Sequence, residues 1–108
     1  MPRRGLAAPI GSSLLSGREI AYLEAMKILY FAWLRAKIGL AEERVEPPAE
    51  VVDVASLLRW LKGRGPSFAE ALKDLAVVRV AVNQEYVPVS HPVRPDDEVA
   101  LFPPVTGG

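Results

Sequence analysis

The last two residues of the chain, Gly107 and Gly108, are the residues best placed to do chemistry. Neither has a side chain, so the backbone and its terminal carboxylate can enter a channel too narrow for any other residue. The reactive group on offer is then the α-carboxylate of Gly108. Small residues are also common at ordinary chain ends, where they have no special role. We favour the chemical interpretation because of the residues that precede the two glycines.

Two prolines lead into this end of the chain and stiffen it. Pro103 and Pro104 each fix φ and lack an N–H group, which favours an extended, polyproline-II-like arm. The hydrophobic segment Glu98–Phe102 runs directly into this arm and has the composition of a β-strand. The sequence therefore predicts a strand that delivers a thin, flexible tail, residues 103–108, with a reactive end.

The bulk composition narrows the possible partners. The chain has 108 residues, enough for one domain with a small core, and its formal net charge is zero. Such a chain has no overall field to draw it onto nucleic acid or an anionic membrane, so we expect neither as its main partner. It has no cysteine, which excludes disulfides and thiol nucleophiles and fits a cytoplasmic location. Any sulfur that it handles cannot sit on a cysteine of its own.

Residues 1–25 differ from the rest of the chain. They are rich in Gly, Ser, Pro and Arg and lack sustained periodicity, and their apolar stretch is too interrupted for a signal peptide. We interpret them as a disordered extension or as the result of an upstream start codon, with Met26 the true initiator. The folded domain is then expected to span residues 26–102.

Five strands and three helical segments are expected in this domain. The strands are rich in β-branched and aromatic residues or show a period of two. The main helix has a plausible N-cap in Asp53, an apolar stripe at helical spacing and a stop at Gly63. A capping box of Ser67 and Glu70 is expected to open a shorter helix. The expected strands are Lys27–Ala32, Glu42–Glu46, Val77–Asn83, Tyr86–Val89 and Glu98–Phe102; the main helix is Val54–Lys62, and Trp33–Gly39 is a short helix or turn.

This order of elements predicts an α+β fold, most simply a β-grasp, with one helix across one face of a mixed sheet. The other face of the sheet is then open, although the strands carry apolar residues on both sides. Leu29, Phe31, Tyr86 and Phe102 should therefore form an exposed apolar patch beside the tail. Such a patch usually marks a protein interface. The alternative is that these residues complete an ordinary core.

The remaining candidates for chemistry have simpler explanations. His91 is the only histidine and lies in a loop without a partner cluster, which favours a structural role. The consecutive acids Asp96, Asp97 and Glu98 are typical of a solvated turn. We expect no metal site and no catalysis by this chain alone.

The domain and tail together resemble a known family. From Met26 to Gly108 the chain resembles the small subunit of molybdopterin synthase, a ubiquitin-like sulfur carrier. The final octet is the specific part, because Gly-Gly alone is shared by every ubiquitin-like modifier. The matching stretches are Phe31-Ala32-Trp33-Leu34-Arg35, Val80-Ala81-Val82-Asn83-Gln84, His91-Pro92 and Asp97–Gly108.

The resemblance implies a cycle of sulfur transfer on Gly108. An E1-like activating enzyme would use ATP to adenylate the carboxylate, and a sulfur donor such as a cysteine desulfurase or a rhodanese would convert it to a thiocarboxylate. The tail would then enter a large synthase subunit, in a complex expected to be a heterotetramer. There its sulfur would convert cyclic pyranopterin monophosphate to molybdopterin. No cofactor would be bound by this chain itself.

The resemblance also implies the residues that contact the partner. The positions of Phe31, Tyr86 and Phe102 form the docking surface in the family, which agrees with the apolar patch expected from periodicity. Pro103 and Pro104 would hold the tail extended, and Arg35 matches a family arginine that we expect to pair with an acid on a partner. Leu101 stands where the family more often has a second aromatic residue.

Two other functions stay open on the sequence. A sulfur carrier for thiamine synthesis or tRNA thiolation would keep the tail and change the docking patch. A ubiquitin-like binding or modifier module would have the same fold without a thiolated end.

Overall fold

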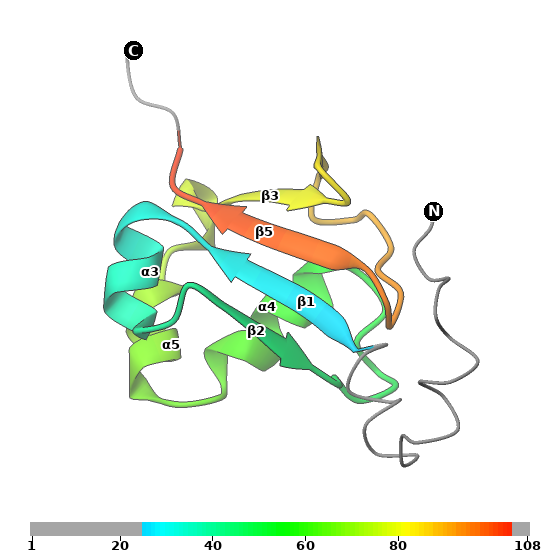
Figure 1. The fold of residues 1–108 in the computed structure, drawn as a ribbon, viewed down its shortest axis with the longest axis horizontal. Coiled ribbons are helices and arrows are strands. Elements are labelled where there is room, and N and C mark those ends of the chain that lie inside the picture. Colours follow the sequence, from blue (N-terminus) through cyan, green and yellow to red (C-terminus); the bar gives the residue numbers. More distant parts are fainter. Residues whose placement is uncertain (1–24, 105–108) are drawn as a thin grey trace, which may run out of the picture.

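The computed structural model describes residues 25–104 (Figure 1), and Gly107 and Gly108 lie outside this range. The described residues form a mixed five-stranded sheet with helices packed against it. The elements are β1 (Met26–Tyr30), α3 (Ala32–Ile38), β2 (Glu42–Val45), α4 (Val54–Lys62), α5 (Pro66–Ala71), a 3-10 helix (Leu75–Val77), β3 (Arg79–Val82), β4 (Glu85–Tyr86) and β5 (Glu98–Phe102).

The strand order β2-β1-β5-β3-β4 brings the first and last described strands together at the centre of the sheet. β1 and β5 run parallel, and the outer neighbours β2 and β3 pair with them in antiparallel register. α4 and α5 lie behind the sheet in Figure 1, so that one face of the sheet is covered and the other is open. The expected α+β, β-grasp architecture is confirmed.

The core lies between α4 and the covered face of the sheet. The apolar stripe of α4 is fully buried, as its spacing predicts, and it contributes Val54, Leu57, Leu58 and Leu61. The alternate residues of the central strands meet this stripe, which is the expected result of a period of two. Burying each of these large side chains stabilises the fold by about 1.5–3 kcal/mol.

Asp53 caps the amino end of α4, as the sequence predicts. Its carboxylate accepts a hydrogen bond of 2.7 Å from the Ser56 hydroxyl and one of 2.8 Å from the Ser56 backbone N–H. The Ser56 hydroxyl oxygen in turn accepts the Asp53 backbone N–H at 3.0 Å. The bonds from the Ser56 hydroxyl and then from its N–H hold the pKa of the Asp53 carboxyl below its ordinary value of 3.8. The helix ends at Gly63.

Because of this cap, part of the free energy of unfolding should depend on pH in the acid range. Because the pKa of Asp53 is lower in the folded chain, its contribution is fully present above about pH 4 and is lost as the pH falls through the folded pKa. We expect Asp53→Asn to make the difference in free energy of unfolding between pH 7 and pH 3 smaller than in the wild type. Urea titrations at both pH values measure it, and equal differences in the two proteins would contradict the prediction.

Several expected boundaries were wrong for identifiable reasons. The strand expected at Lys27–Ala32 ends at Tyr30, because Phe31 already caps α3 and Ala32 has a φ of 55°. The strand expected at Tyr86–Val89 is only Glu85–Tyr86, and Pro88 has no N–H group with which to extend the pairing. β3 is shorter than the expected Val77–Asn83, since Val77 belongs to the 3-10 helix.

The capping box expected from Ser67 and Glu70 does not form. The N-cap of α5 is Gly65 and Pro66 occupies the first turn, so Ser67 lies inside the helix and cannot cap it. Glu70 instead accepts a hydrogen bond of 2.8 Å from the Lys73 ammonium group. The start of α5 is therefore set by Pro66, whose φ is already close to the helical value, and not by a side-chain capping motif.

Asp97 is likewise not part of a solvated acidic face. It is buried, and its carboxylate accepts hydrogen bonds from the Asn83 side-chain amide at 3.0 Å and the Arg94 backbone N–H at 2.8 Å. Asn83 also accepts the Glu98 backbone N–H at 3.0 Å. These bonds fix the turn after β3 against the start of β5.

Candidate functional site: an aromatic cluster where the tail leaves the sheet

Three aromatic side chains meet on the open face of the sheet. We call Phe31, Tyr86 and Phe102 the aromatic cluster. The rings of Phe31 and Phe102 stack with their centroids 4.7 Å apart and their planes 2° from parallel, and the Tyr86 ring is tilted against Phe102 at 5.7 Å. Phe31 is 39% exposed and Tyr86 is 68% exposed. The expected apolar patch therefore exists, and its aromatic residues do not complete the core.

The parallel pairing of β1 and β5 brings Phe31 and Phe102 together. Their carboxyl ends lie at the same edge of the sheet, where Tyr30 is opposite Leu101. The Phe31 backbone N–H then donates to the Leu101 carbonyl oxygen at 3.1 Å. Phe102, one residue further along β5, is the last residue of its strand before the prolines.

A tight turn places Tyr86 beside them. Asn83 and Gln84 have φ values of 51° and 72°, which is the left-handed geometry of a two-residue hairpin loop. This turn folds β4 back along β3, with Tyr86 opposite Ala81 and Phe102 opposite Arg79. The sequence predicted the turn at these two residues correctly.

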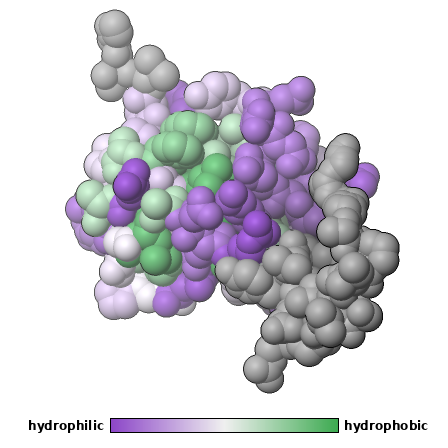
Figure 2. Space-filling model, in the orientation of Figure 1, coloured by the Kyte–Doolittle hydropathy of each residue, from purple (hydrophilic) through white to green (hydrophobic). Residues whose placement is uncertain are grey.

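Small side chains occupy the middle of the open face of the sheet. Ala81 and Ala100 are directly paired across β3 and β5, and Ala100 is also paired with Leu29 of β1. Their methyl groups project only a short distance from the sheet, so the rings of the aromatic cluster project further than they do. Figure 2 shows hydrophobic surface gathered toward the side of the molecule on which β5 ends, and hydrophilic surface increasing toward the opposite side.

The other expected contact residues lie around this cluster. Arg35 is exposed on α3, and its guanidinium makes no hydrogen bond or ion pair with the residues between 25 and 104. Pro103 and Pro104 are half-buried and continue from Phe102. The structure thus brings Phe31, Tyr86, Phe102 and the start of the tail together, with Arg35 one helical turn beyond Phe31.

Sequence reasoning missed a groove beside the tail. It has a volume of about 640 Å³ and is lined by side chains such as Leu75, Val87, Val89 and Pro103. Its two walls are the 3-10 helix and the segment after β4. The only sequence signal was the apolar alternation of Val87 and Val89, which was interpreted as part of a strand.

The metal-binding and histidine candidates can also be placed in the described part of the chain. Within residues 25–104 no group of three or more His, Asp or Glu side chains is arranged to hold a metal ion. His91 lies in its loop with Nδ1 2.7 Å from the Pro92 carbonyl oxygen. No helix in this part of the chain is long and apolar enough to cross a membrane. The arrangement is one of docking: an aromatic face that adjoins a strand running out into the tail.

The ThiS family model matches residues 28–108 of the chain, which include the sheet except for Met26 and Lys27 of β1, and the tail. The chain belongs to the ThiS family. A curated relative, the molybdopterin synthase sulfur carrier subunit of Escherichia coli strain K12, is 39% identical to this ThiS-family chain over 83 residues, which are 77% of this chain and 99% of the relative.

Solved structures share the fold. The crystal structure of small archaeal modifier protein 1 from Haloferax volcanii has a TM-score of 0.60 and 28% identity, and the match covers 77% of this ThiS-family chain and 98% of that one. A second likeness is to a chain in the protein–protein complex of subunits 1 and 2 of the molybdopterin-converting factor from Helicobacter pylori. Its TM-score is 0.51 and its identity is 22%, and the match covers 77% of this chain and 97% of that chain. At this identity the second likeness concerns the fold alone.

Proposed function

We propose that this chain is the sulfur carrier of a molybdopterin synthase and carries sulfur as a thiocarboxylate on Gly108. The observation that supports this most strongly is the aromatic cluster at the point where the tail leaves the sheet. It gives a partner an apolar surface that fixes the origin of the tail. The E. coli relative, which is named as a molybdopterin synthase sulfur carrier subunit, aligns over nearly its whole length.

The loading of sulfur requires activation of the Gly108 carboxylate and then transfer of sulfur to it. In the first, a carboxylate oxygen of Gly108 attacks the α-phosphorus of ATP on an E1-like enzyme, and pyrophosphate leaves. In the second, the terminal sulfur of a persulfide on a donor such as a cysteine desulfurase or rhodanese attacks the acyl carbon, and AMP leaves with one oxygen of the carboxylate. A thiol reductant then cleaves the S–S bond of the resulting acyl disulfide, so that the donor cysteine and the thiol end as a disulfide and the sulfur stays on Gly108. The product is a thiocarboxylate, so the chain needs no cysteine and binds no cofactor of its own. Because these steps consume ATP, we also propose a cytoplasmic location.

Delivery of the sulfur then depends on docking. The aromatic cluster packs against a large synthase subunit, Arg35 pairs with an acid on that subunit, and Pro103 and Pro104 direct residues 103–108 into its pocket. Gly107 leaves the arm narrow enough to enter. The catalytic groups that convert cyclic pyranopterin monophosphate to molybdopterin lie on the large subunit, and the complex is a heterotetramer of two such pairs.

A second candidate is a protein modifier. It is favoured by the likeness to the Haloferax volcanii protein, which is named as a small archaeal modifier. A modifier would be activated at the same Gly108 carboxylate but would end in an amide bond to a lysine. A sulfur carrier for thiamine or tRNA thiolation would share the thiocarboxylate and differ in the partner.

The mass of the intact chain separates these functions. After incubation with an E1-like enzyme, ATP and a sulfur source, we expect a gain that corresponds to one oxygen exchanged for sulfur. A chain that lacks Gly108 is the control and should gain nothing. Addition of a large subunit with the pterin precursor should then return the original mass and yield molybdopterin. An unchanged mass with an active enzyme would leave the modifier as the better explanation.

A further inference from the structure

An edge of the sheet lies in the groove beside the tail. β4 is only two residues long, and the next hydrogen bond to β3 runs from the Val87 N–H to the Val80 carbonyl oxygen at 3.0 Å. Beyond that point the chain leaves the sheet and contacts α4, where the Val89 carbonyl oxygen accepts the Ala55 N–H at 2.9 Å. The start of β3 therefore has β5 on one side and the groove on the other.

Two backbone groups on this edge have no hydrogen-bond partner among residues 25–104. Alternate residues of a strand direct their N–H and C=O groups to the same side. The Asn83 N–H donates to the Glu98 carbonyl oxygen of β5 at 2.8 Å, so the odd-numbered residues of β3 face β5. The even-numbered residues then face the groove. No hydrogen bond within the described residues uses the Val78 carbonyl oxygen or the Val80 N–H on that side.

These two groups are poorly exposed to solvent. Val78 and Val80 are 6% and 4% exposed, and both line the groove. A backbone group that is shielded from water without a partner costs free energy comparable to a lost hydrogen bond. One residue separates the two groups, which is the spacing at which an added strand forms its hydrogen bonds. An extended segment of a partner can therefore donate to Val78 and accept from Val80.

The residue between them, Arg79, indicates the charge of that segment. It is the only charged residue that lines the groove, and its guanidinium donates to the Ala76 carbonyl oxygen at 3.5 Å without an ion pair to any residue between 25 and 104. In an added antiparallel strand, the residue opposite Arg79 has its side chain on the same face. An acid there would pair with Arg79. A second copy of this chain would instead bring two Arg79 side chains together, which is unfavourable.

The groove is continuous with the aromatic cluster. Tyr86 belongs to both, and Arg79 is directly opposite Phe102 across β3 and β5. Pro103 also lines the groove, at the end of the sheet from which the tail leaves (Figure 1). A partner that covers the cluster and receives the tail therefore also reaches the free edge of β3.

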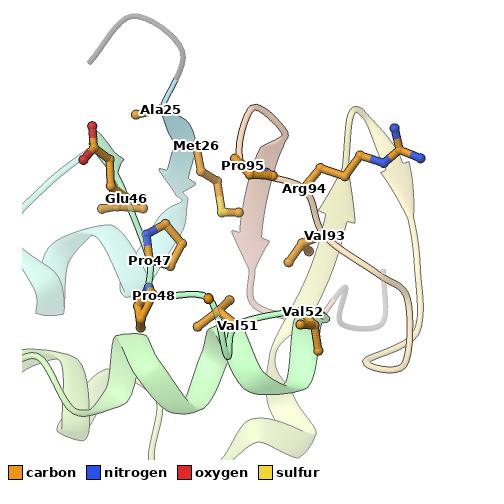
Figure 3. Close-up of a pocket in the computed structure, with 12 residues that line it drawn as sticks. Ala25, Met26, Glu46, Pro47, Pro48, Val51, Val52, Val93, Arg94 and Pro95 are labelled. Carbon is orange, nitrogen blue, oxygen red and sulfur yellow. The ribbon is translucent and has the colours of Figure 1, made fainter. Parts of the chain in front are cut away.

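A second groove, at the amino ends of β1 and β5, is built differently. It has a volume of about 520 Å³, and its lining includes Met26 and Val93 (Figure 3). The backbone of its loops is paired, because the Val93 N–H donates to the Val52 carbonyl oxygen at 3.1 Å and Asp53 forms a β-bridge with Pro92. The aromatic cluster is at the carboxyl ends of the same strands. This second groove therefore supplies controls for the groove beside the tail.

We propose that the large synthase subunit adds an extended segment to the edge of β3 at Val78–Val80, with an acidic side chain opposite Arg79. This assignment rests on the proposed function, because it gives the partner of the aromatic cluster a second contact. The segment lies between the 3-10 helix and the chain after β4, where its apolar side chains contact Leu75 and Val87. Its backbone hydrogen bonds fix the register of the partner at the end of the sheet from which the tail leaves.

Amide hydrogen exchange, measured residue by residue by NMR on the full chain, tests these hydrogen bonds. In the free chain the Val80 amide should exchange faster than the Ala81 amide, whose N–H faces β5. Addition of the large subunit should slow the exchange of Val80 about tenfold or more, because its N–H gains an acceptor. The Val93 amide, which is already bonded in the second groove, is the control and should not change.

A charge reversal tests the acid on the partner. Arg79→Glu should weaken binding of the large subunit about tenfold in calorimetric titration, and Arg79→Lys should bind nearly like the wild type. Val52→Asp is the matched control, since it puts a charge on an exposed residue of the second groove. Because Arg79 lies opposite Phe102, a loss of affinity without slower Val80 exchange in the wild-type complex would place Arg79 in the aromatic surface alone and overturn the added strand.

The remaining outcomes separate this proposal from the proposed function. If the wild type binds the large subunit and delivers its sulfur while Val80 exchange is unchanged, the added strand is overturned and the sulfur carrier stands. If the wild type does not bind the large subunit, both are overturned. Protection of Val80 that rises with the concentration of the chain alone would overturn the proposal in favour of a second copy as the occupant.

Discussion

Replacing Tyr86 with alanine should weaken binding to a molybdopterin synthase large subunit by about 30-fold, the effect of losing about 2 kcal/mol at a binding hot spot. Tyr86 is the most exposed member of the aromatic cluster, and its ring is held against Phe102 at 5.7 Å. A ring that is already ordered in the free chain loses little conformational freedom when a partner covers it. Most of its burial therefore contributes to affinity.

The exposure of Tyr86 also allows an effect on binding to be separated from an effect on folding. A side chain that is 68% exposed at the edge of the sheet contributes little to folding, so the melting temperature of the free chain should hardly change. Phe102 is less suitable, because it is half-buried and stacked on Phe31, and its removal would disturb the open face before any partner is added.

Calorimetric titration of the purified chain with the large subunit measures this effect. Val52→Ala is the control at the other end of the sheet, where an exposed side chain should not affect partner binding. Tyr86→Phe should bind nearly as tightly as the wild type, since the ring makes the contact. If Tyr86→Ala retained wild-type affinity while the Val52 variant lost it, the docking face would lie elsewhere on the molecule.

The elements of this fold that the sequence predicts best are those that depend on neighbours along the chain. The cap at Asp53, the apolar stripe of α4 and the turn at Asn83-Gln84 each follow from residues within one or two turns. The exposure of the aromatic residues was also predictable, because apolar residues on both faces of a strand cannot all pack under one helix.

The features that local reasoning missed depend on contacts between distant segments. The stacking of Phe31 on Phe102 requires the parallel register of β1 and β5, which are separated by most of the domain. Asp97 is buried because Asn83 lies across from it, although its sequence neighbours are acids on a turn. The groove beside the tail forms between the 3-10 helix and the segment after β4, which no local pattern brings together. These features depend on the pairing of segments that are distant in the sequence, which the propensity of a single segment does not predict.

A partly buried polar network joins β1, β2 and the turn that follows α4. The Tyr30 hydroxyl donates to the Glu43 carboxylate at 2.6 Å, and the Arg64 guanidinium donates to the same oxygen at 2.7 Å. Arg64 also lies over the rings of Trp60 and Phe68, at 5.2 and 4.9 Å from their centroids. Burial, and then the hydrogen bond to Glu43, raises the pKa of Tyr30 above its ordinary value, so its hydroxyl remains a donor.

We expect Glu43→Ala to lower the free energy of unfolding by about 3 kcal/mol, because it leaves the Tyr30 hydroxyl without an acceptor inside the core and removes the partner of Arg64. Tyr30 is 1% exposed, so its hydroxyl has little access to water in the intact chain. For a domain of this size the melting temperature should fall by about 12–24 °C.

The adjacent residue provides a matched control for this prediction. Glu42 makes only a 3.9 Å ion pair with Lys27, and its side chain is 58% exposed. Glu42→Ala should therefore change the free energy of unfolding by less than about 0.5 kcal/mol. Thermal and urea unfolding of the two variants measure the contrast, and equal melting temperatures would mean that the network contributes little.

A second substitution separates the two causes of the loss. In a Glu43→Ala background, Tyr30→Phe removes the unsatisfied hydroxyl and should recover about 1–2 kcal/mol of the lost stability. The same Tyr30→Phe change in the wild type should destabilise, since Glu43 then loses a donor. This reversal of sign is specific to a buried donor that needs its acceptor, and it would be absent if Glu43 acted only through its pairing with Arg64.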